Sequence, residues 1–226
     1  TLLVQGLLGA IAVNTAYLAQ RYEWGILYHL DFPPAITLAV SLLFLDFGIY
    51  VQHILFHAMP ILWRLHMVHH TDLDFDVTTG IRFHPLEIVI SLFYKLALIV
   101  VIGASPWGVV VFEILLNASS LFNHGNVHIP EGIDRWLRWF LVTPDVHRIH
   151  HSPSFRETNS NFGFSITWWD RLCGTFRDRP QHPHTDMEIG LTPYRNPQEL
   201  GLVSLLTMPF LNAAQQKVES YSFRKR

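Results

Sequence analysis

Four long apolar stretches limit the folds open to this chain more than any other feature of its sequence. They cover residues 2–19, 34–52, 87–103 and 106–122, and each is close to the length that a helix needs to cross a bilayer. Half of all residues are apolar and only 15% are charged, whereas about 25% is usual for a soluble domain. The sequence therefore predicts an all-α integral membrane protein, a single domain over residues 1–226 with about four transmembrane helices.

Two charged residues inside the third and fourth stretches predict a contact. Lys95 and Glu113 lie at nearly the same distance from the turn at Ser105 and Pro106. Charges within a membrane are unfavourable and are usually paired. We therefore expect an ion pair between Lys95 and Glu113 across a hairpin of two helices.

The basic residues predict the orientation. An even number of spans puts both chain ends on one side, together with residues 53–86 and 123–200. Arg21 lies between the first two stretches and Lys95 inside the third, while the other 14 of the 16 lysines and arginines lie on the side of those two regions. Because basic residues are enriched in cytoplasmic loops, we expect these regions to form a helical cap on the cytoplasmic side.

Further features exclude several classes of protein. A formal net charge of −2 gives no reason to expect nucleic acid as a partner, and a single cysteine, Cys173, can form neither an internal disulfide nor a cysteine-based zinc site.

The chain begins with Thr1 and not with Met, so we expect that residues before it have been removed, and its first residues lack the basic segment of a secretory signal. Residues 202–211 are apolar but too short to span, so we expect them at the membrane interface or packed on the domain. The basic tail 222–226 is expected to be solvated and to touch anionic lipid.

Ten of the fourteen histidines fall into four clusters with two repeated spacings. His-x3-His is followed by His-x2-His-His, and the same ordered pair then occurs again. On a helix, residues three and four apart share a face, so we expect each cluster to point its imidazoles in one direction. Histidine is the commonest metal ligand, and so many rings predict a site with more than one metal. The predicted ligands are His53, His57, His66, His69, His70, His124, His128, His147, His150 and His151.

The kind of metal site is narrowed by the number of ligands. Imidazole suits zinc, copper, iron and nickel alike. A hydrolytic zinc site needs only three protein ligands and water, and the metalloprotease pattern His-Glu-x-x-His is absent. A two-iron centre that activates dioxygen, with about five histidines for each metal, accounts for ten histidines better than a hydrolytic zinc site does. A zinc-dependent membrane hydrolase and a non-catalytic metal-binding or metal-transport protein remain as alternatives.

Three blocks of residues flank the clusters. Asp46-Phe-Gly-Ile-Tyr50 precedes the first cluster, Thr143-Pro144-Asp145 precedes the last, and Asn161-Phe-Gly163 with Trp169-Asp170-Arg171-Leu-Cys173-Gly174-Thr175 follows it. Together with the cluster order, they resemble the fatty acid hydroxylase/sterol desaturase superfamily of integral membrane di-iron oxygenases over about residues 46–175, with Cys173 in place of a usual aromatic residue. The segment Arg82-Phe-His84-Pro-Leu-Glu87 is similar to the branch that contains sterol C5-desaturase-like proteins and alkylglycerol monooxygenase.

The resemblance implies an activity and its cofactors. It implies dioxygen-dependent hydroxylation or desaturation of a C–H bond in a membrane lipid with a sterol-like, ether or acyl structure. Two iron ions would be held by the histidines, which do not act as acids or bases, and zinc could replace iron in purified protein. The chain has no Gly-x-Gly-x-x-Gly motif, so electrons would come from an external NAD(P)H-linked donor through a separate cytochrome b5-like or ferredoxin-like protein.

Several neighbouring residues are expected to support the ligands. Ligating histidines usually donate their second ring N–H to a carboxylate or a carbonyl. For Asp170, a salt bridge to an arginine is an equal alternative. Thr143 and Pro144 predict the start of the helix that carries the last cluster. The predicted supporting residues are Asp46, Tyr50, His84, Asp145, Asn161 and Asp170.

Overall fold

A computed structural model describes residues 2–211, with side chains from residue 6 onward. The regular structure of the described chain consists of helices, with no β-strand and only an isolated bridge between Leu141 and Ile166, which confirms the all-α prediction. Within the described residues it divides into two compact units, one formed by residues 2–52 and 88–118 and the other by residues 53–87 and 119–211. The basic tail 222–226 and its predicted lipid contact lie outside the described residues.

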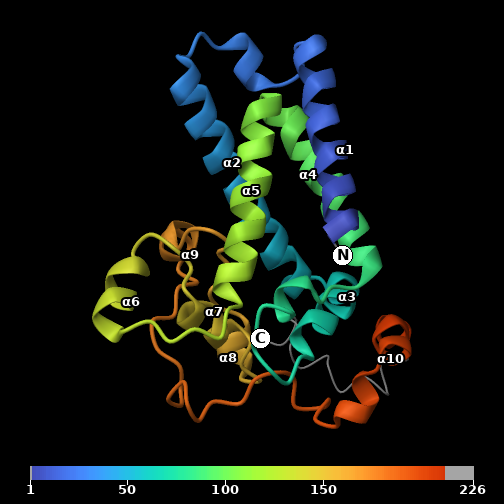
Figure 1. Cartoon of the computed structure of the whole chain (residues 1–226), viewed down its shortest axis with the longest axis vertical. Helices are drawn as coiled ribbons and strands as arrows, with labels where there is room; N and C mark the ends of the chain where they lie inside the picture. The colour runs from blue at the N-terminus through green and yellow to red at the C-terminus, as the bar shows by residue number, and fades with distance from the viewer. Residues whose placement is uncertain (1, 212–226) are drawn as a thin grey trace. The chain divides into compact units, whose positions relative to one another are not determined.

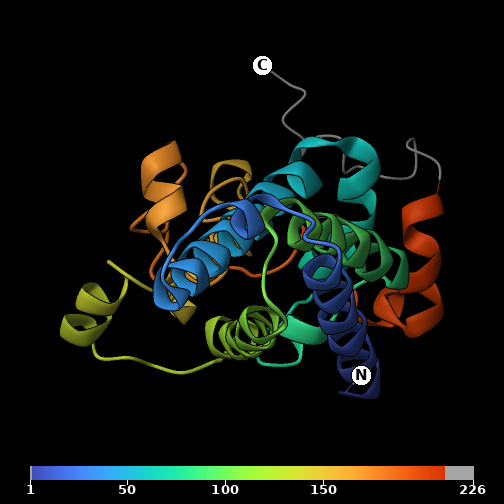
Figure 2. The same ribbon diagram turned by 90° about the horizontal axis from the view of Figure 1, so that it is seen from above.

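Long helices make up the first unit (Figure 1). Seen from above, α5 is viewed nearly end-on, whereas α1, α2 and α4 are tilted (Figure 2). Helices α2, α4 and α5 also contribute residues to the second unit. The elements are α1 (Leu2–Arg21), the short 3-10 helix η1 (Ile26–His29), α2 (Pro34–Ala58), α4 (Pro85–Ile102) and α5 (Pro106–Asn123).

Local sequence explains where these helices begin and end. Three of them start at a proline, whose fixed φ suits the first helical position and whose missing N–H would have no helical partner there. Helix α4 stops at Gly103, which takes a φ of 75° that other residues rarely adopt. The hydroxyl of Ser105 then accepts a hydrogen bond from the backbone N–H of Gly108 at 3.1 Å and so caps α5.

The core of the first unit draws on all four long helices. Its buried members include Ala12 and Ala16 of α1, Leu45 of α2, Ile99 of α4 and Phe112 of α5. Ala12 and Ala16 are completely buried, so α1 contributes small side chains to this core.

An ion pair joins the two helices of the predicted hairpin. Lys95 Nζ on α4 lies 2.5 Å from Glu113 Oε1 on α5, and both side chains are largely buried. The predicted pairing is therefore confirmed.

Two helices, α2 and α4, are long and apolar enough to cross a membrane. Only 28% and 17% of their most apolar windows are buried, so part of each helix surface stays exposed, as lipid-facing helices require. Among the described residues, α1 and α5 do not reach the same threshold, so two of the four predicted spans are supported. Helix α2 also continues beyond residue 52 and carries the first histidine cluster.

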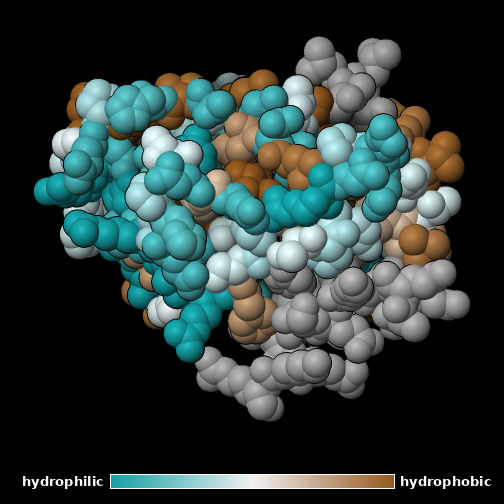
Figure 3. Space-filling model, turned by 90° about the horizontal axis from the view of Figure 1, so that it is seen from below, coloured by the Kyte–Doolittle hydropathy of each residue, from teal (hydrophilic) through white to brown (hydrophobic). Residues whose placement is uncertain are grey.

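The second unit consists of short helices and long loops (Figure 1). Seen from below, much of the described surface is hydrophilic, with apolar residues in smaller patches (Figure 3). Its elements, apart from the ends of α2, α4 and α5, are α3 (Pro60–His70), η2 (Thr79–Ile81), α6 (Glu131–Leu137), α7 (Pro144–His150), α8 (Phe155–Thr158), α9 (Trp168–Cys173), η3 (Pro197–Leu200), α10 (Leu202–Thr207) and η4 (Met208–Phe210).

The apolar residues 202–211 form α10 and η4. Met208 is buried with Trp63 and Met67 of α3, so this segment packs on the second unit, one of the two predicted outcomes. Leu202 and Val203 remain about three-quarters exposed.

Candidate metal centre

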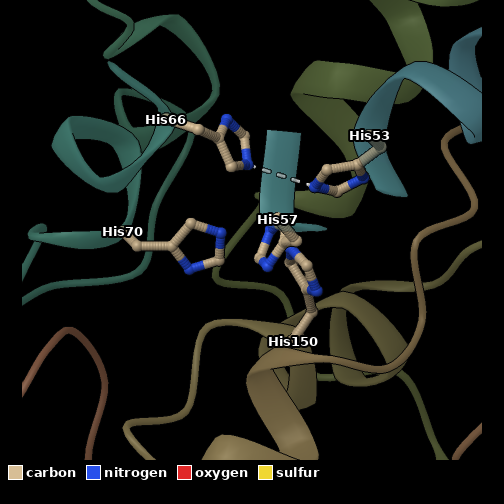
Figure 4. A group of neighbouring side chains, drawn as sticks. All are labelled: His53, His57, His66, His70 and His150. Atoms are coloured by element: carbon tan, nitrogen blue, oxygen red, sulfur yellow. Dashed lines mark hydrogen bonds between the residues drawn. The ribbon is translucent and has the colours of Figure 1, made fainter. Parts of the chain in front are cut away.

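Nine buried histidines of the second unit form two groups, and within each group the ligand atoms lie within 4.8 Å of one another. Figure 4 shows the rings of the larger group arranged around a common centre. The five-histidine group consists of His53, His57, His66, His70 and His150. The four-histidine group consists of His69, His124, His147 and His151.

Each His-x2-His-His cluster divides between the two groups. On α3, His66 and His70 are four residues apart and share the five-histidine group, whereas His69 belongs to the other. At α7 the pattern is reversed, because His150 joins the five-histidine group while His147 and His151 join the other. The prediction that each cluster points in one direction is therefore wrong for these clusters. Adjacent residues differ by about 100° around a helix, so consecutive histidines reach different centres.

His128 is the one predicted ligand that the structure does not bring into either group. It is exposed, while His124 is buried. Helix α5 ends at Asn123, and residues 124–130 are not helical. The four-residue spacing therefore no longer places the two rings on one face, and the expected convergence of ten histidines is corrected to nine.

Backbone carbonyls orient three of the rings. His53 Nδ1 donates to the carbonyl oxygen of Phe162 at 2.9 Å, and His150 Nδ1 donates to that of Ser160 at 2.8 Å. His124 Nδ1 donates to the carbonyl oxygen of Ser120 at 2.8 Å. A carbonyl can only accept, so each neutral ring carries its proton on Nδ1 and has a lone pair on Nε2.

A buried carboxylate orients a fourth ring. Glu87, in the first turn of α4, accepts a hydrogen bond from His66 Nδ1 at 2.6 Å. Glu87 was not among the predicted supporting residues, although it belongs to a segment that carries the family resemblance. A carboxylate at the start of an otherwise apolar helix could have marked Glu87 as a supporting residue. Because Glu87 lies 21 residues from His66, however, the local sequence did not indicate their contact.

The nitrogen atoms fit bound metal ions better than they fit one another. His53 Nε2 lies 3.2 Å from His66 Nε2, and His124 Nε2 lies 3.2 Å from His69 Nε2 and 3.0 Å from His147 Nε2. In the first pair both Nδ1 atoms donate, so when both rings are neutral their two Nε2 lone pairs face each other. Two nitrogens that share one ion at about 2.1 Å lie roughly 3.0–3.4 Å apart.

Ring nitrogens without hydrogen bonds support the same conclusion. Within residues 2–211, both nitrogens of His57, His70 and His151 are buried and make no hydrogen bond. Buried polar atoms are normally satisfied, and those that are not require an explanation such as an ion. The residues present therefore fit two metal ions, one in each group.

Burial favours the neutral form of six of these rings at pH 7. It lowers the pKa of His150 to about 3 and that of His124 to about 4, even though the carbonyl contacts of both rings act in the opposite direction. Burial, reinforced by neighbouring imidazoles, also lowers the pKa values of His69, His70, His147 and His151. Neutral imidazole is the form that binds a metal.

Asp170 supports His53 through the loop 160–163. Its buried carboxylate accepts hydrogen bonds from the backbone N–H groups of Phe162 at 2.8 Å and Gly163 at 2.6 Å and from the Thr175 hydroxyl at 2.6 Å. A Cβ on Gly163 would lie only 2.6 Å from Asp170 Oδ2, so this close approach requires glycine. Asp170 therefore binds backbone N–H groups of this loop. Within the described residues it neither accepts a hydrogen bond from a histidine nor forms the alternative salt bridge.

Asn161 holds the same loop in place. It takes a φ of 53°, a left-handed conformation that asparagine tolerates. Its amide donates to the carbonyl oxygens of Val146 and Arg177 at 2.9 and 3.0 Å, and its own oxygen accepts from the Arg177 N–H at 2.7 Å. The loop that supplies the carbonyls for His53 and His150 is thus tied to α7.

Other predicted supporting residues have different contacts. Asp145 pairs with Arg148 at 2.8 Å instead of a ligand histidine. His84 donates from Nε2 to the Leu206 carbonyl at 3.2 Å, and its Nδ1 accepts the Leu86 N–H at 3.2 Å, so it joins the start of α4 to α10.

The remaining predictions around the histidines concern two helices. Asp46 and Tyr50 are buried on α2 in the first unit. Helix α7 begins at Pro144 as predicted, but the Thr143 side chain makes no capping hydrogen bond.

Known proteins resemble this chain over the same region. Residues 38–175 match the family described as fatty acid hydroxylase and include all nine histidines. The ornithine lipid hydroxylase OlsE of Rhizobium tropici is 30% identical over 92% of this chain and 63% of its own length. The alkylglycerol monooxygenase of Xenopus tropicalis is 28% identical over 61% of this chain and 30% of its own length. The cholesterol 25-hydroxylase of Rattus norvegicus is 26% identical over 62% of this chain and 47% of its own length.

The chain spans between about a third and two thirds of the length of these curated relatives. No solved structure matches it. The predicted resemblance, including its alkylglycerol monooxygenase branch, is confirmed by the family match and the relatives. The family match covers more than half of the sequence, and the chain therefore belongs to the fatty acid hydroxylase family.

Proposed function

We propose that this protein oxidises a C–H bond in a membrane lipid, by hydroxylation or desaturation, with dioxygen as co-substrate and two iron ions as cofactor. The observation that carries the proposal is the pair of adjacent, buried, all-histidine groups in a chain of this family. Two such groups in one protein exceed the needs of a hydrolytic zinc site, which uses three protein ligands.

The chain's own residues would hold and shield the metal ions. The five-histidine group would bind one ion and the four-histidine group the other. When bound, iron would supply the activation of dioxygen that an unreactive C–H bond requires. The protein contributes neutral lone pairs, ring orientations set by Phe162, Ser160, Ser120 and Glu87, and a buried setting that excludes water.

A membrane lipid is the proposed substrate for two reasons. Two helices are apolar and outward-facing enough to cross a membrane. The relatives named above are, by their names, hydroxylases or monooxygenases of an ornithine lipid, an alkylglycerol and cholesterol. All three names denote lipids, which suits a protein with helices that could face lipid.

The topology and the electron supply extend the proposal. We propose that residues 1–226 act as one membrane-embedded domain with four spans, and that the histidine-bearing regions form a cap on the cytoplasmic face. The excess of basic residues in these regions supports the cytoplasmic orientation, and the hydrophilic surface in Figure 3 supports a face exposed to water. A separate electron-transfer protein of the cytochrome b5 or ferredoxin type would dock on that face.

The test combines metal analysis with lipid profiling. Purified protein should contain close to two iron or zinc ions per chain, and cells that express it should contain an oxidised lipid that control cells lack. His150→Ala should abolish the product, while the matched control His128→Ala should preserve it because that ring is exposed and lies outside both groups. Unchanged lipids in the wild type, or a product formed without dioxygen and reductant, would contradict the proposal.

A further inference from the structure

The two histidine groups are not held equally firmly. In the five-histidine group, three rings are oriented through Nδ1, by the Phe162 carbonyl, the Ser160 carbonyl and the Glu87 carboxylate. In the four-histidine group only His124 is oriented in this way. The Nδ1 atoms of the other three rings are buried and make no hydrogen bond within the described chain. A ring already held in its binding orientation loses less conformational freedom when it takes up an ion.

Glu87 adds a negative charge to the five-histidine group alone. The residue is 4% exposed, and its Oε1 contacts His66 Nδ1 at 2.6 Å. Its second oxygen, Oε2, is buried without a hydrogen bond in the described part of the protein. No ion pair within residues 2–211 joins a carboxylate to a ring of the four-histidine group.

A positive charge on the His66 side of this contact would complete the arrangement, and a bound cation can supply it. A buried carboxylate is unfavourable without a compensating positive charge, and a neutral imidazole donor compensates it only in part. A metal ion on His66 Nε2 would supply the missing charge through the ring. The carboxylate would in turn fix the ring and strengthen its lone pair as a donor, as carboxylates behind metal-binding histidines commonly do.

We infer that the five-histidine group is the tighter of two unequal metal sites and that Glu87 is its positioning residue. The inference rests on the proposed function only in that both groups hold metal ions. Substitution of such a supporting residue typically weakens metal binding 10–100-fold. The ion in the four-histidine group is the one that leaves first.

The experiment measures metal retention on the full chain in detergent. Zinc-loaded protein is equilibrated with increasing concentrations of a chelator, and the zinc-to-protein ratio is measured by mass spectrometry. The wild type should lose its zinc in two separate steps, each close to one ion per chain. His151→Ala should affect the first step and His57→Ala the second, which assigns each step to its group.

Glu87→Gln tests the positioning role because glutamine keeps an acceptor oxygen but removes the charge. It should shift the second step 10–100-fold toward lower chelator concentration and leave the first step in place. The matched control is Asp134→Asn, which removes another buried carboxylate of the same unit, one that pairs with Arg138 and not with a histidine. It should leave both steps unchanged.

The outcomes separate this inference from the proposed function. Loss of both ions in one step by the wild type, or a Glu87→Gln variant that moves the first step or neither step, would overturn the inference, and the wild-type result needs no variant to fold. A wild type that binds no metal at all would overturn the proposed function itself. Two-step release without any oxidised lipid would support the unequal sites and contradict only the proposed reaction.

Discussion

The metal-free protein should lose stability steeply between pH 7.5 and pH 5.5. An unfolded histidine titrates near 6.5, whereas burial lowers the folded pKa values of His124 and His150 to about 4 and about 3. Below pH 6.5 these imidazoles are therefore protonated in the unfolded chain but stay neutral in the folded chain, so acid favours unfolding. At pH 5.5 each of these two rings lowers the free energy of unfolding by about 1.4 kcal/mol.

Asp170 opposes this trend but does not cancel it. Burial raises its folded pKa from 3.8 to about 6, so the folded chain binds this proton more readily, and its stabilising effect is lost as pH rises through 6. At pH 5.5 Asp170 raises the free energy of unfolding by about 0.8 kcal/mol. The two histidines therefore leave a net loss of about 2 kcal/mol, and His69, His70, His147 and His151 act in the same direction.

Thermal unfolding followed by circular dichroism measures this effect. A loss of 2 kcal/mol corresponds to a decrease in Tm of at least roughly 4–8 °C for a chain of this size. Metal-loaded protein should resist acid until the ions are released, because bound ions stabilise the neutral rings. An unchanged or higher Tm of metal-free protein at pH 5.5 would refute the conclusion that these rings are buried and neutral.

Three further changes test other parts of the structure. Lys95→Ala should lower the free energy of unfolding by about 3–5 kcal/mol by leaving Glu113 unpaired, and the double variant should be less damaging; equal damage in denaturant titrations would refute the pairing. Asp170→Ala should destabilise the protein by about 1–3 kcal/mol for each backbone N–H left unpaired, and an unchanged Tm would count against its role in the loop. His128→Ala should leave the metal content unchanged, and loss of one ion would show that this ring is a ligand.

Local sequence rules account for the helices and for most of the ligands. Apolar stretches predicted helices close to the observed α2, α4 and α5, and Pro144 predicted the start of α7, because these signals act over a few neighbouring residues. The repeated spacing identified nine histidines that do come together. The match in depth of Lys95 and Glu113 predicted their contact, because a short turn fixes the register of a helical hairpin.

Other features of the site depend on where distant segments meet. Adjacent positions such as His69 and His70 must face different sides of a helix, but which other rings each one meets depends on how α3 packs against α2, α5 and α7. The exposure of His128 depends on where α5 ends, which the four-residue spacing does not show.

The sequence by itself determined which residue types could bind metal and which segments could be helical, since both follow from side-chain chemistry and short-range periodicity. Only the tertiary structure decided which rings share a centre and what orients them. Glu87 reaches His66 across 21 residues, and the acceptors for His53, His150 and His124 are backbone carbonyls. Every residue has a carbonyl, so no sequence pattern marks the ones that become ligand supports; long-range packing selects them.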